Sequence, residues 1–194
     1  MKDILLQYMT RFTSLSKEEQ QAVADELPIR EYKKGDLLLQ QGDMTAVKCY
    51  FVLKGCVRQY FIDESGKEIT VQFFTEKQAI LISNEQKQEA PAAYSFICME
   101  DSVLLVGSTD SERTMYKKYP QLETMVRKMM EISMGEMLDE HAIFISSSPE
   151  ERYKALLQNR PQLISRVPQH QLASYLGVTP ESLSRIKKRL SKDT

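Results

Sequence analysis

Residues 169–186 read QHQLASYLGVTPESLSRI, and this stretch predicts two short helices that cross at a steep angle. Ala173 is the small residue expected where the two helix axes meet, and Gly177 suits a turn that needs positive φ. Thr179 is placed to cap the second helix. Pro180 fits the first position of that helix, where its missing N–H removes no hydrogen bond. The four signals agree and indicate a helix-turn-helix.

The second of these helices has an apolar side and a polar, basic side. Leu183, Ile186 and Leu190 recur three and four residues apart, which would hold the helix against the rest of the chain. Side chains on the opposite side can contact base edges and phosphates, so the pattern predicts a DNA recognition helix. The alternative is an ordinary helical hairpin with a solvated basic face. The predicted DNA-binding residues are Gln169, His170, Thr179, Glu181, Ser182, Ser184, Arg185, Lys188 and Arg189.

Charge is distributed unevenly along the 194 residues. Residues 151–194 carry nine Lys or Arg and three Asp or Glu, a balance of +6, whereas residues 1–150 carry 17 and 24, a balance of −7. Together they give the net charge of −1. A basic C-terminal part on an acidic body favours nucleic-acid contact confined to residues 151–194.

Residues 29–106 have the sequence pattern of a small β domain. Short apolar runs alternate with turn signals at Gly35, Gly42, Gly55 and Gly66. Many short strands with regular turns predict a small barrel or roll and exclude a helical sensor. The predicted strands are Leu37–Leu39, Cys49–Leu53, Val57–Ile62, Ile69–Phe74, Ser95–Met99 and Val103–Val106.

Helices are predicted on both sides of this β domain. Helical spacing over residues 3–15 predicts one, and a capping-box pattern at Ser16 and Glu19 opens a second that should run to about Leu27. From about Tyr116 the spacing of apolar residues becomes helical again. The chain is therefore expected to be α+β.

The helix predicted after Tyr116 is longer than a small domain needs, and its apolar stripe is rich in Met. The stripe continues through His141 and Phe144. We expect it to be the seam of a homodimer, with packing against the β domain alone as the alternative. The predicted dimer-interface residues are Leu122, Met125, Val126, Met129, Ile132 and Met137.

Residues 146–149 read SSSP and mark the best domain boundary. Ser148 can cap the next helix, which should run from Pro149 to about Gln158. The expected organisation is therefore residues 1–117 for the N-terminal helices and β domain, 118–145 for the long helix, and 146–194 for the helix-turn-helix domain.

Several classes of protein are excluded by what the sequence lacks. Charged and polar residues occur throughout residues 1–20, and no apolar run is long enough to span a bilayer, so no membrane association is expected. The three scattered cysteines form no CxxC pair and are expected to be buried thiols in a reducing cytoplasm. With only His141 and His170 and no suitable Gly-rich loop, we predict no catalytic residues, no metal site and no cofactor.

The order of these elements resembles the cyclic-AMP receptor protein/fumarate-nitrate regulator (CRP/FNR) family of bacterial transcription regulators. The most specific segments are KGDLLLQQGD at 34–43, YFVLKGCVR at 50–58, GKE at 66–68 and residues 172–186. The resemblance implies a cyclic-nucleotide-binding-type β-roll (a double-stranded β-helix) followed by a winged-helix-like domain. It also implies a homodimer on a palindromic double-stranded DNA site, with RNA polymerase as a candidate partner. Glu181 and Arg185 occupy the positions that read base edges in the family.

Two departures from the family pattern change these expectations. Members that bind cyclic nucleotides hold the phosphate with a Gly-containing helix start and an Arg, whereas here no Gly lies between Gly66 and Gly107 and no Arg between Arg58 and Arg113. We therefore expect no binding of cyclic AMP, and the loop charges Lys77 and Lys87 are expected to be solvated. Only residues 191–194 follow the recognition helix, too few for a β-hairpin wing, so the wing is expected to be absent.

The sequence is compatible with three classes of function to different degrees. The leading one is a homodimeric, DNA-binding transcription regulator whose effector is unknown. The main alternative is a ligand- or partner-binding module whose helical tail serves assembly. An enzyme is the remaining class, and no arrangement of catalytic side chains supports it.

Overall fold

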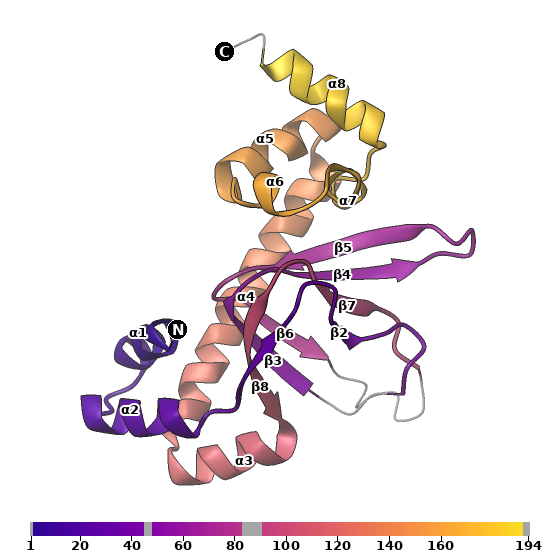
Figure 1. The fold of residues 1–194 in the computed structure, drawn as a ribbon. Helices are drawn as coiled ribbons and strands as arrows, with labels where there is room; N and C mark the ends of the chain where they lie inside the picture. Colours follow the sequence, from indigo (N-terminus) through magenta and orange to yellow (C-terminus); the bar gives the residue numbers. More distant parts are fainter. Residues whose placement is uncertain (1, 45–47, 83–90, 192–194) are drawn as a thin grey trace.

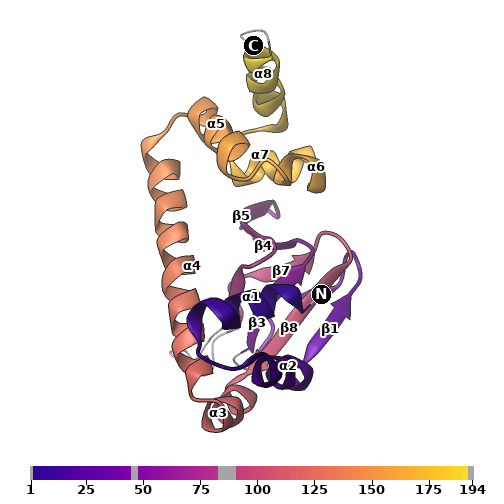
Figure 2. The ribbon, with the colours of Figure 1, turned by 90° about the vertical axis from the view of Figure 1, so that its left-hand side faces the viewer.

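The computed structural model describes residues 2–44, 48–82 and 91–191. A β-roll forms the centre of the molecule, and one long helix runs along its side from the N-terminal helices to the C-terminal helices (Figures 1 and 2). The helices are α1 Asp3–Phe12, α2 Lys17–Glu26, α3 Thr109–Lys118, α4 Gln121–Ser146, α5 Pro149–Asn159, α6 Leu163–Arg166, α7 Gln169–Tyr175 and α8 Pro180–Leu190. The strands are β1 Ile29–Tyr32, β2 Leu37–Leu39, β3 Lys48–Lys54, β4 Val57–Ile62, β5 Glu68–Phe74, β6 Ala79–Ile82, β7 Ser95–Cys98 and β8 Ser102–Ser108.

The roll consists of two four-stranded antiparallel sheets, in the orders β1-β8-β3-β6 and β2-β7-β4-β5. Its interior is filled by apolar side chains from both sheets, including Tyr50, Val52, Phe74, Phe96 and Leu104. Every strand predicted from the sequence is present, which confirms the β-roll. The expected turns at the glycines are confirmed as well, because all four have positive φ.

Strand β3 is apolar along its whole length because both of its faces are covered. Tyr50 and Val52 point into the roll, whereas Phe51 and Leu53 point outward into a second core. This second core joins the outer face of the sheet to α1, α2 and the start of α4, through Leu5, Met9, Val23, Ala24, Phe51, Leu53, Val103, Leu122 and Met125.

Two strands, β1 and β6, and two helices, α3 and the four-residue α6, were not predicted. β1 reads IREY and β6 reads AILI, and both are four-residue strands at opposite edges of the first sheet. Helix α3 carries few apolar residues, so its spacing gives no amphipathic signal. The helix expected from about Tyr116 therefore divides into α3 and α4, which meet at Tyr119 and Pro120.

The predicted helix starts are confirmed by their hydrogen bonds. Ser16 and Glu19 form the expected capping box, with backbone-to-side-chain distances of 2.7 and 3.2 Å. Ser148 caps α5 with Glu151 in the same way. Within the described ranges, no helix combines the length and apolar character needed to cross a bilayer.

Candidate nucleic-acid interface

Helices α7 and α8 pack as the sequence predicts. Ala173 is fully buried at their contact. Leu183 and Ile186, on the inner side of α8, are buried in the same core and anchor the helix. Gly177 has a φ of +69°, which turns the chain between the helices. The Thr179 hydroxyl accepts a hydrogen bond from the backbone N–H of Ser182 at 3.2 Å, so the predicted N-cap is confirmed.

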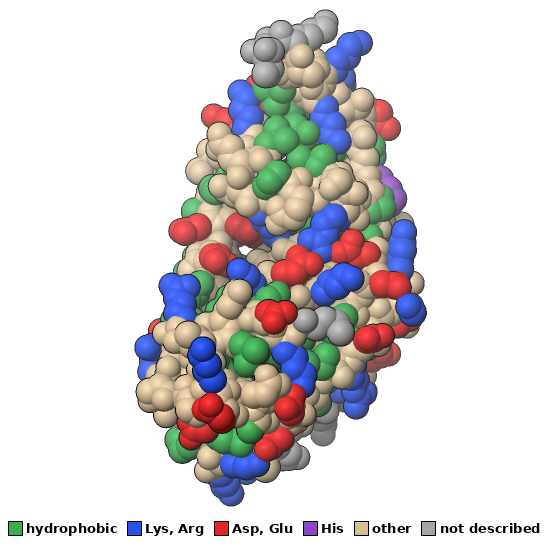
Figure 3. All heavy atoms as spheres, turned by 60° about the vertical axis from the view of Figure 1, so that its left-hand side comes forward, with side chains coloured by type: hydrophobic (Ala, Val, Ile, Leu, Met, Phe, Trp, Pro, Cys, Tyr) green, Lys and Arg blue, Asp and Glu red, His purple; other side chains and the backbone are tan. Residues whose placement is uncertain are grey.

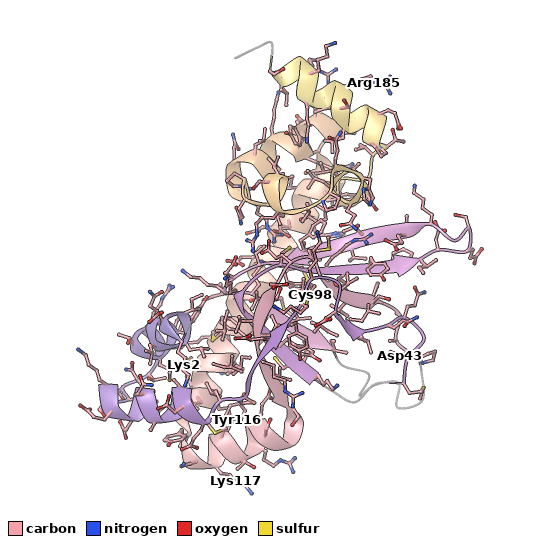
Figure 4. All side chains as sticks on the ribbon, in the orientation of Figure 1. Lys2, Asp43, Cys98, Tyr116, Lys117 and Arg185 are labelled. Atoms are coloured by element: carbon pink, nitrogen blue, oxygen red, sulfur yellow. The ribbon has the colours of Figure 1, made fainter. Side chains whose placement is uncertain are left out.

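The opposite side of α8 faces solvent. Glu181, Ser184, Arg185 and Lys188 are exposed there, and Arg185 points away from the rest of the chain (Figure 4). Within the part of the chain that the structure describes, the Arg185 guanidinium makes one long hydrogen-bond contact, 3.4 Å to the hydroxyl of Ser182. Its donors are therefore free for a partner outside the chain.

Glu181 remains an acceptor at neutral pH. Hydrogen bonds from its own backbone N–H and from the Thr179 hydroxyl lower the pKa of its carboxyl, and the charge of Arg185 adds to the effect. The pair thus presents an ionised acceptor and a cationic donor one helical turn apart, on the same side of α8.

Not every predicted DNA-binding residue stands on this free surface. Arg189 forms an ion pair with Glu150 of α5, which fixes α8 to the rest of the helical domain. Gln169 and His170 are exposed at the start of α7, and Ser182 is half-buried beside the cap. The residues after Ser191, where the wing prediction falls, lie outside the described part of the chain.

The C-terminal helices dock onto the β-roll through contacts that the sequence did not reveal. Arg166 donates to both carboxylate oxygens of Glu76, each at 2.9 Å, and to Glu100 at 3.1 Å. Glu76 in turn accepts the backbone N–H of Gly55 at 2.8 Å. Figure 3 shows acidic and basic side chains alternating in a band across the middle of the molecule.

A second set of contacts lies around the buried side chain of Arg160. Its guanidinium donates to the backbone carbonyl of Phe73 at 2.5 Å and pairs with Glu140 of α4 at 3.2 Å. The hydroxyl of Ser174 on α7 accepts the backbone N–H of Thr70 at 2.9 Å. Because β5 is an edge strand, this contact satisfies a donor that the sheet leaves open.

Helix α4 is apolar on two sides, and this changes the predicted dimer seam. Leu122 and Met125 are buried in the chain's own second core, and Val126 and Met129 pack against it, so these four residues face inward. Ile132 and Met137 are exposed, as a seam requires. The large apolar side chains exposed on the helix are Ile132, Met134, Met137, Leu138, Phe144 and Ile145, with Phe144 lying under the guanidinium of Arg152.

Among the described residues, the interior of the β-roll has no free cationic side chain available to bind a cyclic phosphate. Arg58 is buried, but its guanidinium is already bound to Glu68 at 2.6 Å and to the hydroxyl of Thr70 at 2.9 Å. Lys77 is exposed in a turn, with a φ of 73°. Lys87 lies outside the described residues. Among the residues that the structure describes, no cluster of three metal-ligating side chains occurs.

Comparison with known proteins agrees with this geometry. Residues 29–119 match the family model of the cyclic nucleotide-binding domain, and no curated protein matches the sequence. A CooA mutant from Carboxydothermus hydrogenoformans has a similar structure, with 17% identity and a TM-score of 0.65 over 97% of this chain and 84% of CooA.

Two proteins named as regulators have similar folds. The c-di-GMP responsive regulator CLP from Xanthomonas campestris has 15% identity and a TM-score of 0.65, over 92% of this chain and 93% of CLP. A regulator assigned to the crp/fnr family from Eubacterium rectale has 16% identity and a TM-score of 0.64, over 96% and 88%. At these identities the likeness concerns the fold, which is that of the CRP/FNR regulators.

Proposed function

We propose that this chain, which carries a cyclic nucleotide-binding-type domain at residues 29–119 and has the fold of CRP/FNR regulators, is a homodimeric DNA-binding transcription regulator. The observation that carries the proposal is the outer side of α8. Glu181, Arg185 and Lys188 project there from a helix whose inner side is anchored by Leu183 and Ile186. A helix supported in this way can enter the major groove of DNA and present its side chains to base edges.

Selection of bound sites from random DNA tests the proposal. A two-fold symmetric DNA-binding protein should enrich an inverted repeat with half-site centres about 34 Å apart, one helical turn of DNA. Binding measured by gel shift should weaken steeply with salt, because Lys and Arg contacts displace counterions from phosphates. Absence of DNA binding at low salt would favour the alternative, a ligand- or partner-binding module whose helical tail serves assembly.

The exposed apolar side of α4 supports the homodimer. Met134, Met137, Leu138 and Ile145 are 65, 53, 62 and 69% exposed, and His141 lies between them. Met134, Leu138, His141 and Ile145 follow one another at separations of four, three and four residues, which matches the seam of a coiled coil. By the rise of an α-helix, the 26 residues of α4 extend about 39 Å, enough for several turns of contact with a second copy.

Replacing Met134 and Met137 together by Glu is expected to convert the dimer into a monomer. Four like charges would be buried at the seam of two such chains, while neither side chain supports the fold of a single chain. Sedimentation velocity at micromolar concentration measures the change. Met44→Glu is the control, because Met44 is 66% exposed but lies on the roll and should not affect assembly. A wild-type protein that sediments as a monomer would contradict the prediction.

Cyclic AMP and cyclic GMP are expected not to bind. The roll interior is occupied by Tyr50, Phe74 and Phe96, and the buried Arg58 already pairs with Glu68. A cyclic phosphate would therefore lose its water without gaining a free cation in this part of the roll. Calorimetric titration of the wild-type protein measures this directly. A micromolar dissociation constant for either nucleotide would show that other groups hold the phosphate.

A further inference from the structure

A cavity of about 110 Å³ lies outside the roll, between the N-terminal helices, the outer face of β3 and β8, helix α3 and the first half of α4. Its walls are almost entirely apolar. Five methionines contribute to them: Met9, Met115, Met125, Met129 and Met130. Methionine side chains adapt easily to irregular ligands, and a dry apolar cavity of roughly 150 Å³ can hold a benzene molecule. At about 110 Å³ this cavity is smaller than that and has room for a short branched alkyl group rather than an aromatic ring.

One carboxylate interrupts the apolar lining. Glu112 of α3 lines the cavity, and no described side chain forms an ion pair or hydrogen bond with it. Gly107 leaves space for the side chain of Glu112, because a Cβ at residue 107 would come within 2.8 Å of Oε1 of Glu112. Burial among these apolar side chains raises the pKa of the Glu112 carboxyl above its ordinary value.

The groups nearest to Glu112 do not neutralise it. Cys49 of β3 and Tyr116 of α3 also line the cavity, and burial raises the pKa of Cys49 to about 11 and that of Tyr116 to about 12. Both side chains are thus uncharged at neutral pH. The cavity combines apolar walls with a single anionic group and lacks a cation to match it among its lining residues.

We propose that this cavity binds a small apolar amine, with its hydrocarbon group among the methionines and its ammonium group against Glu112. The amine supplies the positive charge and the donors that Glu112 lacks, and a charge-assisted hydrogen bond is strongest where water is excluded. The ligand would contact the roll, α3 and α4 at once. The inference does not depend on DNA binding, because it rests on the cavity and its carboxylate alone.

Three small probes of one shape separate the contributions of charge and hydrocarbon: isobutylamine, isobutanol and isovalerate. Binding is followed by NMR of protein labelled at the methionine methyl groups. The amine should shift Met115 and Met129, which line the cavity, and leave Met44 and Met134, which lie on the surface, unchanged. We expect it to bind about tenfold more tightly than the alcohol, with the carboxylate weakest.

Glu112→Gln should abolish this preference and bring the amine to the affinity of the alcohol, because the charge is lost while the shape is kept. Glu64→Gln, in an exposed turn, is the matched control and should bind as the wild type does. Three results would each overturn the proposal: no shift at Met115 and Met129 at saturating amine, an undiminished preference in Glu112→Gln, or tighter binding of the carboxylate than of the alcohol.

Discussion

Replacing Arg166 by alanine is expected to destabilise the protein by about 2–3 kcal/mol. Removing one partner of a buried ion pair costs about 3–5 kcal/mol, because the remaining charge stays buried without compensation. The side chain of Arg166 is 18% exposed, but those of Glu76 and Glu100 are 34 and 35% exposed. Solvent partly screens these two carboxylates, so the expected loss of stability is about 2–3 kcal/mol rather than about 3–5 kcal/mol.

Urea unfolding followed by circular dichroism measures this loss of stability. Arg166→Lys should be intermediate, because Lys keeps the charge but loses the two-pronged contact with Glu76. Arg127→Ala is the control: its ion pair with Glu131 is exposed and lies within one helix, so about 0.5 kcal/mol is expected. An Arg166→Ala variant no less stable than Arg127→Ala would show that the docking contact contributes little.

The pH dependence of this contact follows from Glu76. Burial by itself raises the pKa of its carboxyl, but hydrogen bonds from Arg166 and from the backbone N–H of Gly55 outweigh burial and lower the pKa. The stabilisation is therefore fully present above the pKa of an unfolded glutamate, about 4.3, and is lost as the pH falls through the lower folded value. The difference in free energy of unfolding between the wild type and Arg166→Ala should therefore become smaller in acid.

Local signals explain why so much of the fold could be predicted. The capping boxes at Ser16 and Ser148, the turn at Gly177 and the cap at Thr179 each involve residues within four positions of one another. Interactions of this range are determined by neighbouring residue types and are visible in the sequence. Helix α3 was not predicted because its sequence contains few apolar residues, so no helical spacing could be recognised.

Contacts between distant residues could not be predicted in this way. Arg166 meets Glu100 and Glu76 across 66 and 90 positions, and the sequence contains no sign that these charges pair. For a related reason, the sequence could not show which apolar residues of α4 belong to a dimer seam and which to the chain's own core. The spacing of Leu122 and Met125 correctly marks an apolar side of α4, but spacing cannot distinguish burial in the same chain from burial in a second one.

Replacing Arg185 by alanine is expected to weaken binding to the preferred DNA site by about 1–3 kcal/mol and to relax the choice of base at one position. A guanidinium can donate two hydrogen bonds to O6 and N7 of one guanine, and alanine offers none. Among the described residues, the hydrogen-bond contact of the Arg185 guanidinium is the 3.4 Å one with Ser182, so the variant should fold as the wild type does. A loss of affinity can then be assigned to DNA contact.

Affinities on the selected site and on a scrambled duplex, each at two salt concentrations, distinguish reading of bases from attraction to phosphates. Arg185→Ala should lose affinity mainly on the selected site. Lys188→Ala should lose affinity equally on both duplexes and lower the salt slope by about one unit, as expected for a phosphate contact. Arg189→Ala is less informative, because it also removes the ion pair that joins α8 to Glu150 of α5. Equal losses for Arg185→Ala on both duplexes would make Arg185 a phosphate contact, and no loss on either would remove it from the interface.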